Sequence, residues 1–71
     1  MEYKQQLKIL SKRIKEGRIN KGLTQKSLAS KSGVSLSRLL NVESGNIKNI
    51  QISTLYKIAN GLDVKVFTFF E

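Results

Sequence analysis

The amino-acid sequence predicts a compact all-α domain of four to five helices, and three observations support this prediction. Apolar residues recur at steps of three and four along most of the 71-residue chain, which is the spacing of one helix face. Proline is absent, and glycines stand where one such stretch gives way to the next. A chain of this length is too short for two domains and buries only about 60% of its unfolded surface, so its core is small.

The first helix is expected from about Lys4 to Lys21. A stripe at helical spacing runs along this stretch and ends before Gly22, a suitable C-terminal glycine. Its members are Leu7, Leu10, Ile14, Gly17, Arg18 and Lys21. Two members are unusual, because Gly17 weakens a helix interior by about 1 kcal/mol relative to alanine and Arg18 places a guanidinium on the buried side. Arg18 therefore requires a partner.

The second helix is expected over residues 25–32. Thr24 is a good N-cap for it, and Leu28 and Ala29 supply its apolar face. Ala29 is small where two helices must cross closely, and Gly33 can adopt the left-handed conformation of a tight turn. The chain is therefore expected to turn sharply at Gly33 into another helix.

The third helix is expected to follow Ser35 as its N-cap and to run to about Ser44, where Gly45 ends it. Leu39 and Val42, three residues apart, mark its inward side. Two short helices joined by a tight turn have the layout of a helix-turn-helix motif.

A fourth helix is expected after the polar loop from Gly45 to Gln51, with an interruption near Gly61 and Asp63. Its apolar positions are Ile52, Leu55, Ile58, Ala59 and Leu62. The tail from residue 64 to 71 fits a strand as well as a short buried helix, and periodicity does not decide between them.

Charge is distributed unevenly along the chain, whose net charge is +8. Eleven basic and three acidic residues lie at or before Lys48, and two of each follow it. This asymmetry favours a polyanionic partner for one face of the protein, with an ordinary solvated basic surface as the alternative.

Several function classes are excluded by composition. The chain has no cysteine and no histidine, which argues against disulfides, thiolate nucleophiles, the usual zinc sites and imidazole acid–base catalysis. We therefore expect no enzyme, no metal and no cofactor. Neither a signal peptide nor a membrane-spanning stretch is visible, so a soluble cytoplasmic protein is expected. A basic amphipathic helix lying on a membrane, over residues 4–21, is a weaker alternative.

Four segments of this chain resemble, in order, the lambda-repressor/Cro-type family of DNA-binding domains, also called the XRE family. They are Lys21-Gly22-Leu23, Thr24 to Ser35, Leu39 to Gly45, and Thr54 to Ala59. The resemblance extends from about Leu10 to Phe70. It implies one lambda-repressor-like domain over residues 1–71, with the helix-turn-helix at about 24–45 and a dimerisation tail at about 52–71.

The resemblance implies that the third helix enters the major groove of DNA and that the second crosses the phosphate backbone. Arginine suits guanine and asparagine suits adenine, so Arg38 and Asn41 are expected to read bases. Leu36 and Leu40 are candidates for thymine methyl groups, although Leu40 could instead pack against the first two helices or lie exposed without a contact. The expected DNA-binding residues are Gln25, Lys26, Ser35, Leu36, Ser37, Arg38, Asn41, Ser44, Asn46 and Lys48.

Part of this set is expected to hold the phosphate backbone. Gln25 matches a family glutamine that grips a phosphate and can brace the recognition helix. Lys26, Ser44, Asn46, Lys48 and Asn49 lie where relatives contact the backbone, which supplies affinity but no sequence information. Five further basic residues are too spread around the first helix to form one stripe, so most of them are expected only to add long-range attraction. They are Lys4, Lys8, Lys12, Arg13 and Lys15.

Family members commonly pair an arginine at the position of Arg18 with a glutamate at the position of Glu43. Independently of the family, Arg18 lies on an apolar stripe, and Glu43 is the only acid between Glu16 and Asp63. We therefore expect a partly buried ion pair, with two exposed and unrelated charges as the alternative.

The apolar tail suggests self-association. Phe67 stands where relatives often carry an exposed acid, and an exposed phenylalanine on an uncharged end favours a homodimer. The expected interface residues are Leu55, Val66, Phe67, Phe69 and Phe70. In the alternative, these aromatics complete the core of the single chain, which suits Val66, Phe69 and Phe70.

These inferences together predict a sequence-specific double-stranded DNA-binding transcriptional regulator. It would bind a palindromic operator as a homodimer, encoded by a bacterium or phage, and would most resemble the controller proteins of restriction-modification systems. No membrane and no small-molecule ligand are expected. The alternative is an antitoxin or protein-interaction module in which DNA binding is secondary.

Overall fold

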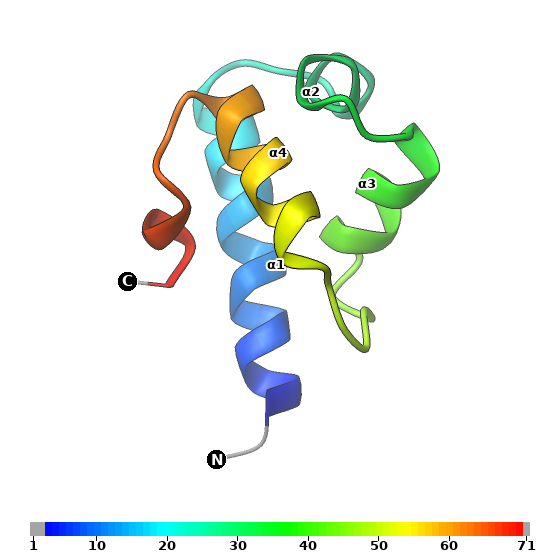
Figure 1. The fold of residues 1–71 in the computed structure, drawn as a ribbon, viewed down its shortest axis with the longest axis vertical. Helices are drawn as coiled ribbons and strands as arrows, with labels where there is room; N and C mark the ends of the chain where they lie inside the picture. Colours follow the sequence, from blue (N-terminus) through cyan, green and yellow to red (C-terminus); the bar gives the residue numbers. More distant parts are fainter. Residues whose placement is uncertain (1–2, 71) are drawn as a thin grey trace.

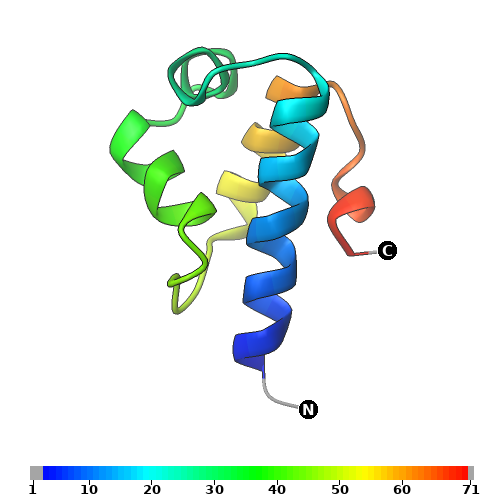
Figure 2. The ribbon, with the colours of Figure 1, turned by 180° about the vertical axis from the view of Figure 1, so that it is seen from behind.

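The computed structural model describes residues 3–70, which form four α-helices and a closing 3-10 helix and contain no strand. The elements are α1 (Tyr3–Asn20), α2 (Gln25–Ser32), α3 (Leu36–Glu43), α4 (Ile52–Leu62) and η1 (Val66–Phe70). Figures 1 and 2 show α1 running the length of the molecule, with α2 and α3 on one side of it and η1 on the other. The prediction of an all-α fold is confirmed, and the tail is a helix rather than a strand.

The boundaries of α2 follow from its capping residues. The Thr24 hydroxyl accepts a hydrogen bond from the Ser27 backbone N–H at 3.0 Å, and the Ser27 hydroxyl accepts one from the Thr24 N–H at 3.0 Å. This reciprocal pair is a capping box. At the other end, Gly33 has φ +72°, the left-handed conformation that closes a helix at low cost for glycine. The predicted range of residues 25–32 is therefore confirmed.

Helix α3 begins with a cap as well. The Ser35 hydroxyl accepts a hydrogen bond from the Arg38 backbone N–H at 3.1 Å. The helix ends at Glu43, one residue before the predicted end, and Gly45 at φ +80° turns the chain into the loop that follows. Helix α4 ends at Leu62, and its C-cap Asp63 adopts a left-handed φ of +57° that aspartate tolerates better than most residues.

The core draws on every helix, as the predicted stripes require. Ile52 is the exception among the residues predicted for α4, since its side chain is 69% exposed. Each aliphatic side chain that is buried in the core stabilises a fold by about 1.5–3 kcal/mol relative to an exposed one. The cluster of buried core residues is Leu10, Ile14, Leu28, Ala29, Leu39, Val42, Leu55, Ile58, Ala59, Leu62 and Phe69.

The tail divides its aromatic residues between core and surface. Phe69 is buried in the cluster, whereas Phe67 and Phe70 are 59% and 64% exposed. The turn at Asp63 brings η1 back beside α1, so Phe69 completes the core of the single chain. Leu55 is buried there too. Two residues expected at a dimer interface therefore lie inside the monomer, and Phe70, which the alternative placed in the core, lies on the surface.

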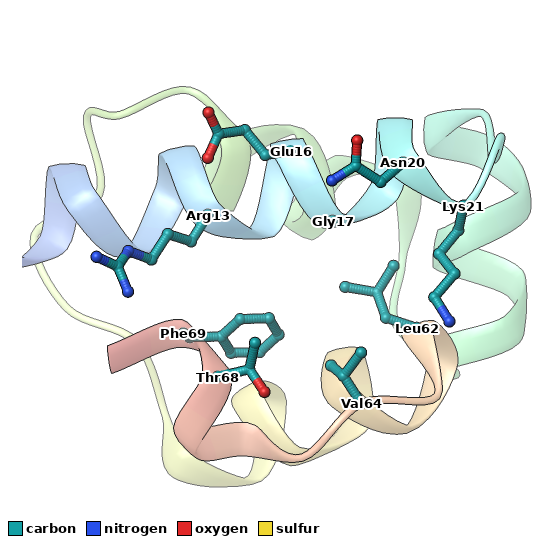
Figure 3. Close-up of a pocket in the computed structure, with 9 residues that line it drawn as sticks. All are labelled: Arg13, Glu16, Gly17, Asn20, Lys21, Leu62, Val64, Thr68 and Phe69. Atoms are coloured by element: carbon teal, nitrogen blue, oxygen red, sulfur yellow. The ribbon is translucent and has the colours of Figure 1, made fainter. Parts of the chain in front are cut away.

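Gly17 borders a groove between α1 and η1 with a volume of about 560 Å³. Figure 3 shows Leu62, Val64 and Phe69 forming the wall opposite α1, while Glu16 points away from η1. A Cβ atom on Gly17 would lie 3.4 Å from Cδ1 of Leu62, an ordinary packing distance. Space and backbone therefore both permit a side chain at this position.

Gly61 is in the opposite situation. A Cβ atom there would collide with the Ser32 hydroxyl and would lie 3.1 Å from the Ser32 backbone nitrogen. Glycine at this position therefore permits the close approach of α2 and α4. No helix in the described part of the chain is long and apolar enough to cross a membrane.

Candidate nucleic-acid interface

Helix α3 has one buried side and one open side. Leu39, Val42 and Glu43 face the interior, and every other residue of the helix is exposed. The open side is not covered by any other segment of residues 3–70, as Figure 1 shows at the outer edge of the molecule. A helix held by one side against the core and free on the other can enter a groove in a partner.

Four of the predicted DNA-binding residues meet on this open side. Ser35, Ser37, Arg38 and Asn41 together line a shallow hollow of about 410 Å³. All four are polar, and none is acidic. Arg38 offers five N–H donors and Asn41 offers both a donor pair and an acceptor, which are the groups that read base edges.

Leu36 and Leu40 form the apolar margin of this open side. They are 40% and 44% exposed, and their spacing of four residues places them next to each other on the helix. Leu40 is thus not buried against α1 and α2. The open side of α3 combines polar groups with two accessible aliphatic side chains.

Arg18 and Glu43 lock the end of α3 to α1. The Arg18 Nε donates to Glu43 Oε2 at 2.8 Å and to Oε1 at 3.1 Å, and the two side chains are 12% and 2% exposed. The Arg18 Nη1 also donates to the Leu23 carbonyl at 2.8 Å, which holds the turn between α1 and α2. The structure therefore brings the predicted partners together and adds a backbone acceptor that sequence reasoning missed.

Gln25 joins the same network from α2. Its Nε2 donates to Glu43 Oε1 at 3.2 Å, so Glu43 binds side chains from both α1 and α2. The amide group has a second hydrogen that this bond does not use. Gln25 can therefore brace α3 and still donate to a phosphate at the N-terminus of α2.

Ser44 forms hydrogen bonds within the loop that follows α3. Its hydroxyl donates to the Asn41 carbonyl at 2.6 Å and accepts from the Asn46 N–H at 3.1 Å. These two bonds shape the loop after α3 and place Ser44 next to the end of that helix. Lys26, Asn46, Lys48 and Asn49 are exposed, with Lys26 in the first turn of α2 and the others in this loop.

Two lysines of α1, for which the sequence predicted only long-range attraction, lie beside the same loop. Lys4 and Lys8 of α1 line a hollow together with Asn46 and Lys48. Their spacing of four residues signals a common helix face. The spacing does not reveal which other segment lies next to that face, because this depends on the tertiary fold.

The sequence matches the helix-turn-helix family model HTH_3 over residues 14–69. The chain belongs to this family, which is of the XRE type. No curated protein matches the sequence.

Three solved structures illustrate what the chain resembles. The restriction-modification controller protein C.AhdI from Aeromonas hydrophila is 33% identical, with a TM-score of 0.83 over 89% of this chain and 94% of that chain. The wild-type controller protein C.Esp1396I is 37% identical, with a TM-score of 0.82 over 92% of this chain and 83% of that chain. SinR, a master regulator of biofilm formation solved in complex with DNA, is 37% identical, with a TM-score of 0.81 over 87% of this chain and 98% of that chain.

The fold, the family and these similar structures agree. All three are typical of regulatory DNA-binding helix-turn-helix proteins, as the sequence predicted.

Proposed function

We propose that this protein is a sequence-specific transcriptional regulator that binds double-stranded DNA by placing α3 in the major groove. The observation that carries the proposal is the open face of α3, where Ser37, Arg38 and Asn41 converge on a hollow without acidic groups. The opposite side of the helix is anchored by Leu39, Val42 and the Glu43 network. A recognition helix fixed in this way loses little conformational freedom on binding.

In this proposal, one set of residues reads the bases and another set holds the phosphate backbone. Arg38 donates to guanine and Asn41 binds adenine, with Ser35 and Ser37 beside them and Leu36 and Leu40 against thymine methyl groups. Gln25, Lys26, Asn46 and Lys48 contact phosphates on either side, which sets the register of the helix in the groove. Ser44, at the start of the same loop, is proposed as a further contact to the backbone.

The protein acts as a homodimer in this proposal. Tyr56 of α4 and Phe67 of η1 line one shared hollow and are 54% and 59% exposed, and Phe70 adds a further exposed ring. A surface of this kind is unusual on a small monomer. Phe67, Phe70 and half-buried Val66 would meet the second copy, while Leu55 and Phe69 support them from the core. A twofold dimer places the recognition helices about one DNA turn, roughly 34 Å, apart on a palindromic operator.

The finer proposal is a controller of restriction-modification genes, acting in the cytoplasm. It is supported by the likeness to C.AhdI and C.Esp1396I, which are controller proteins of such systems. SinR is similar to the same degree, so the support for DNA-dependent regulation is broader than the support for this particular role.

Selection from a pool of random duplexes tests the proposal. We expect enrichment of a palindrome with half-sites about one helical turn apart, bound at least about 10³-fold more tightly than an unselected duplex at the same salt concentration. The region upstream of the protein's own gene is the first natural duplex to compare. Equal affinity for selected and unselected duplexes would contradict sequence-specific regulation.

A further inference from the structure

A second basic surface lies beside the recognition helix, formed by two segments far apart in the sequence. Lys4 and Lys8 come from the first turns of α1, and Asn46 and Lys48 come from the loop that follows α3. They share a hollow of about 460 Å³, which Tyr3, Gly45 and Ile47 also line. We call this surface the α1–loop hollow.

The α1–loop hollow is strongly cationic. Three lysine side chains line it, and no acidic side chain does so among residues 3–70. The one ion pair within those residues joins Arg18 to Glu43, so none of the three ammonium groups is paired with a carboxylate of residues 3–70. Positive charges that face one hollow repel one another, and an anion bound in the hollow relieves that repulsion.

The position of the α1–loop hollow is set by the same contacts that end α3. The Ser44 hydroxyl bonds to the Asn41 carbonyl and to the Asn46 N–H, and Ile47 is buried at 7% exposure. The loop is therefore anchored on both the recognition helix and the core. A phosphate held in the hollow would have a fixed position relative to α3.

We propose that Lys4, Lys8 and Lys48 form a clamp for the DNA backbone, which extends the interface from α3 along α1. This inference rests on the proposed function, since it names where that same DNA continues past the recognition helix. The phosphodiester backbone fits the chemistry because lysine binds phosphate as a point charge, and duplex DNA carries one charge per about 1.7 Å of helix axis. The clamp adds affinity without reading sequence.

Salt dependence of DNA binding tests the clamp. The double variant Lys4→Ala/Lys8→Ala is compared with the wild type on the selected operator and on an unselected duplex, between 50 and 200 mM salt. Each lost phosphate contact lowers the magnitude of the log K against log [salt] slope by about 0.9, so we expect a decrease of about 2 for each bound protomer. Both duplexes should lose affinity by the same factor, roughly 10-fold or more at 100 mM salt.

A matched control removes the same charge elsewhere. Lys12 and Lys57 are exposed lysines outside the α1–loop hollow, and Lys12→Ala/Lys57→Ala has the same net charge as the test variant. We expect its slope to match the wild type. Lys4→Arg/Lys8→Arg keeps the charge and should keep the slope. All four altered positions are exposed, and circular dichroism of each variant verifies that the helices remain folded.

A positional assay gives an independent readout. The chain has no cysteine, so Lys8→Cys introduces a single thiol that can carry an iron chelate for hydroxyl-radical cleavage of bound DNA. We expect cuts in the backbone beside the α3 footprint, and none above background from Lys57→Cys.

The outcomes separate the two proposals. If the wild type does not prefer the selected operator, the proposed function fails. If it does, but the Lys4→Ala/Lys8→Ala slope equals that of the wild type or of the control, or cleavage from position 8 is absent, only the clamp is overturned.

Discussion

Glu43 is the residue on which the geometry of the recognition helix depends. Its carboxylate accepts hydrogen bonds from Arg18 of α1 and Gln25 of α2, although its side chain is only 2% exposed. A buried carboxylate without such partners would be costly. The network therefore joins three helices at the point where α3 ends.

Removal of one member of this network should be severe. We expect Arg18→Ala and Glu43→Ala each to lower the free energy of unfolding by about 3–5 kcal/mol, because each leaves a desolvated charge unpaired. The double change Arg18→Met/Glu43→Leu should cost far less, since it removes both charges. Urea unfolding followed by circular dichroism measures the difference. Single variants that lose less than the double variant would contradict this account.

Arg38 and Lys48 test the proposed division between residues that read bases and residues that hold the backbone. We expect Arg38→Ala to cost about 1–3 kcal/mol in operator binding and to relax the preference at one base pair. Lys48→Ala should instead weaken all duplexes alike, because phosphates carry no sequence information. Binding to single-base variants of the selected operator measures both. An equal loss on every duplex for Arg38→Ala would refute its role in base reading.

At the scale of helices, the glycines within α1 and α4 lie in opposite surroundings, since one has room for a side chain and the other does not. Gly17 borders the open groove of Figure 3, where a side chain has room. Gly61 lies where α4 crosses α2 against Ser32. The sequence flagged Gly17 as a weak point of its helix, but the crowding at Gly61 depends on a contact between distant segments.

The same substitution should therefore have opposite effects at these two sites. Gly17→Ala should raise the free energy of unfolding by about 1 kcal/mol through helix propensity, and Gly61→Ala should lower it because the new methyl group displaces Ser32. A change of 1 kcal/mol corresponds to about 4–8 °C in Tm for a domain of this size. Thermal unfolding of the two variants measures the signs. A shift in the same direction for both would contradict this interpretation of the helix crossing.

At the scale of the whole molecule, η1 and α4 carry an apolar surface that remains exposed to solvent in the single chain. Phe67 and Phe70 lie on it, while Phe69 between them completes the core. The 3-10 helix thus presents different residues to the interior and to solvent. In the proposed homodimer, a second copy covers this surface and adds buried area to the small core of the chain.

Phe67→Glu tests the dimer directly. We expect folded monomers with weakened operator binding, since a carboxylate in the interface opposes burial while the core remains intact. Ile19→Glu is the matched control, because Ile19 is a similarly exposed apolar residue of α1 at 56%. Analytical ultracentrifugation measures the mass of both. A Phe67→Glu variant with the mass of the wild type would count against this interface.

Local signals in the sequence predicted most of the fold. Thr24, Ser35 and the glycines at 22, 33 and 45 mark helix ends by their own backbone preferences, and the structure confirms them. The apolar stripes identified the core residues for the same reason, since a helix face is defined by residues three and four apart. The partners Arg18 and Glu43 could be named because an isolated charge on an apolar stripe requires an opposite charge.

Other features depended on which distant segments meet. Gln25 bonding to Glu43, the collision that excludes a side chain at Gly61 and the approach of Lys4 and Lys8 to Lys48 all join residues at least 18 positions apart. The tail likewise needed the turn at Asp63 to select which aromatic ring enters the core. The sequence by itself determined the helices, their caps and the chemistry of the recognition face, because these follow from neighbouring residues. Only the tertiary structure decided the shared surfaces, because they arise when the core brings separate helices together.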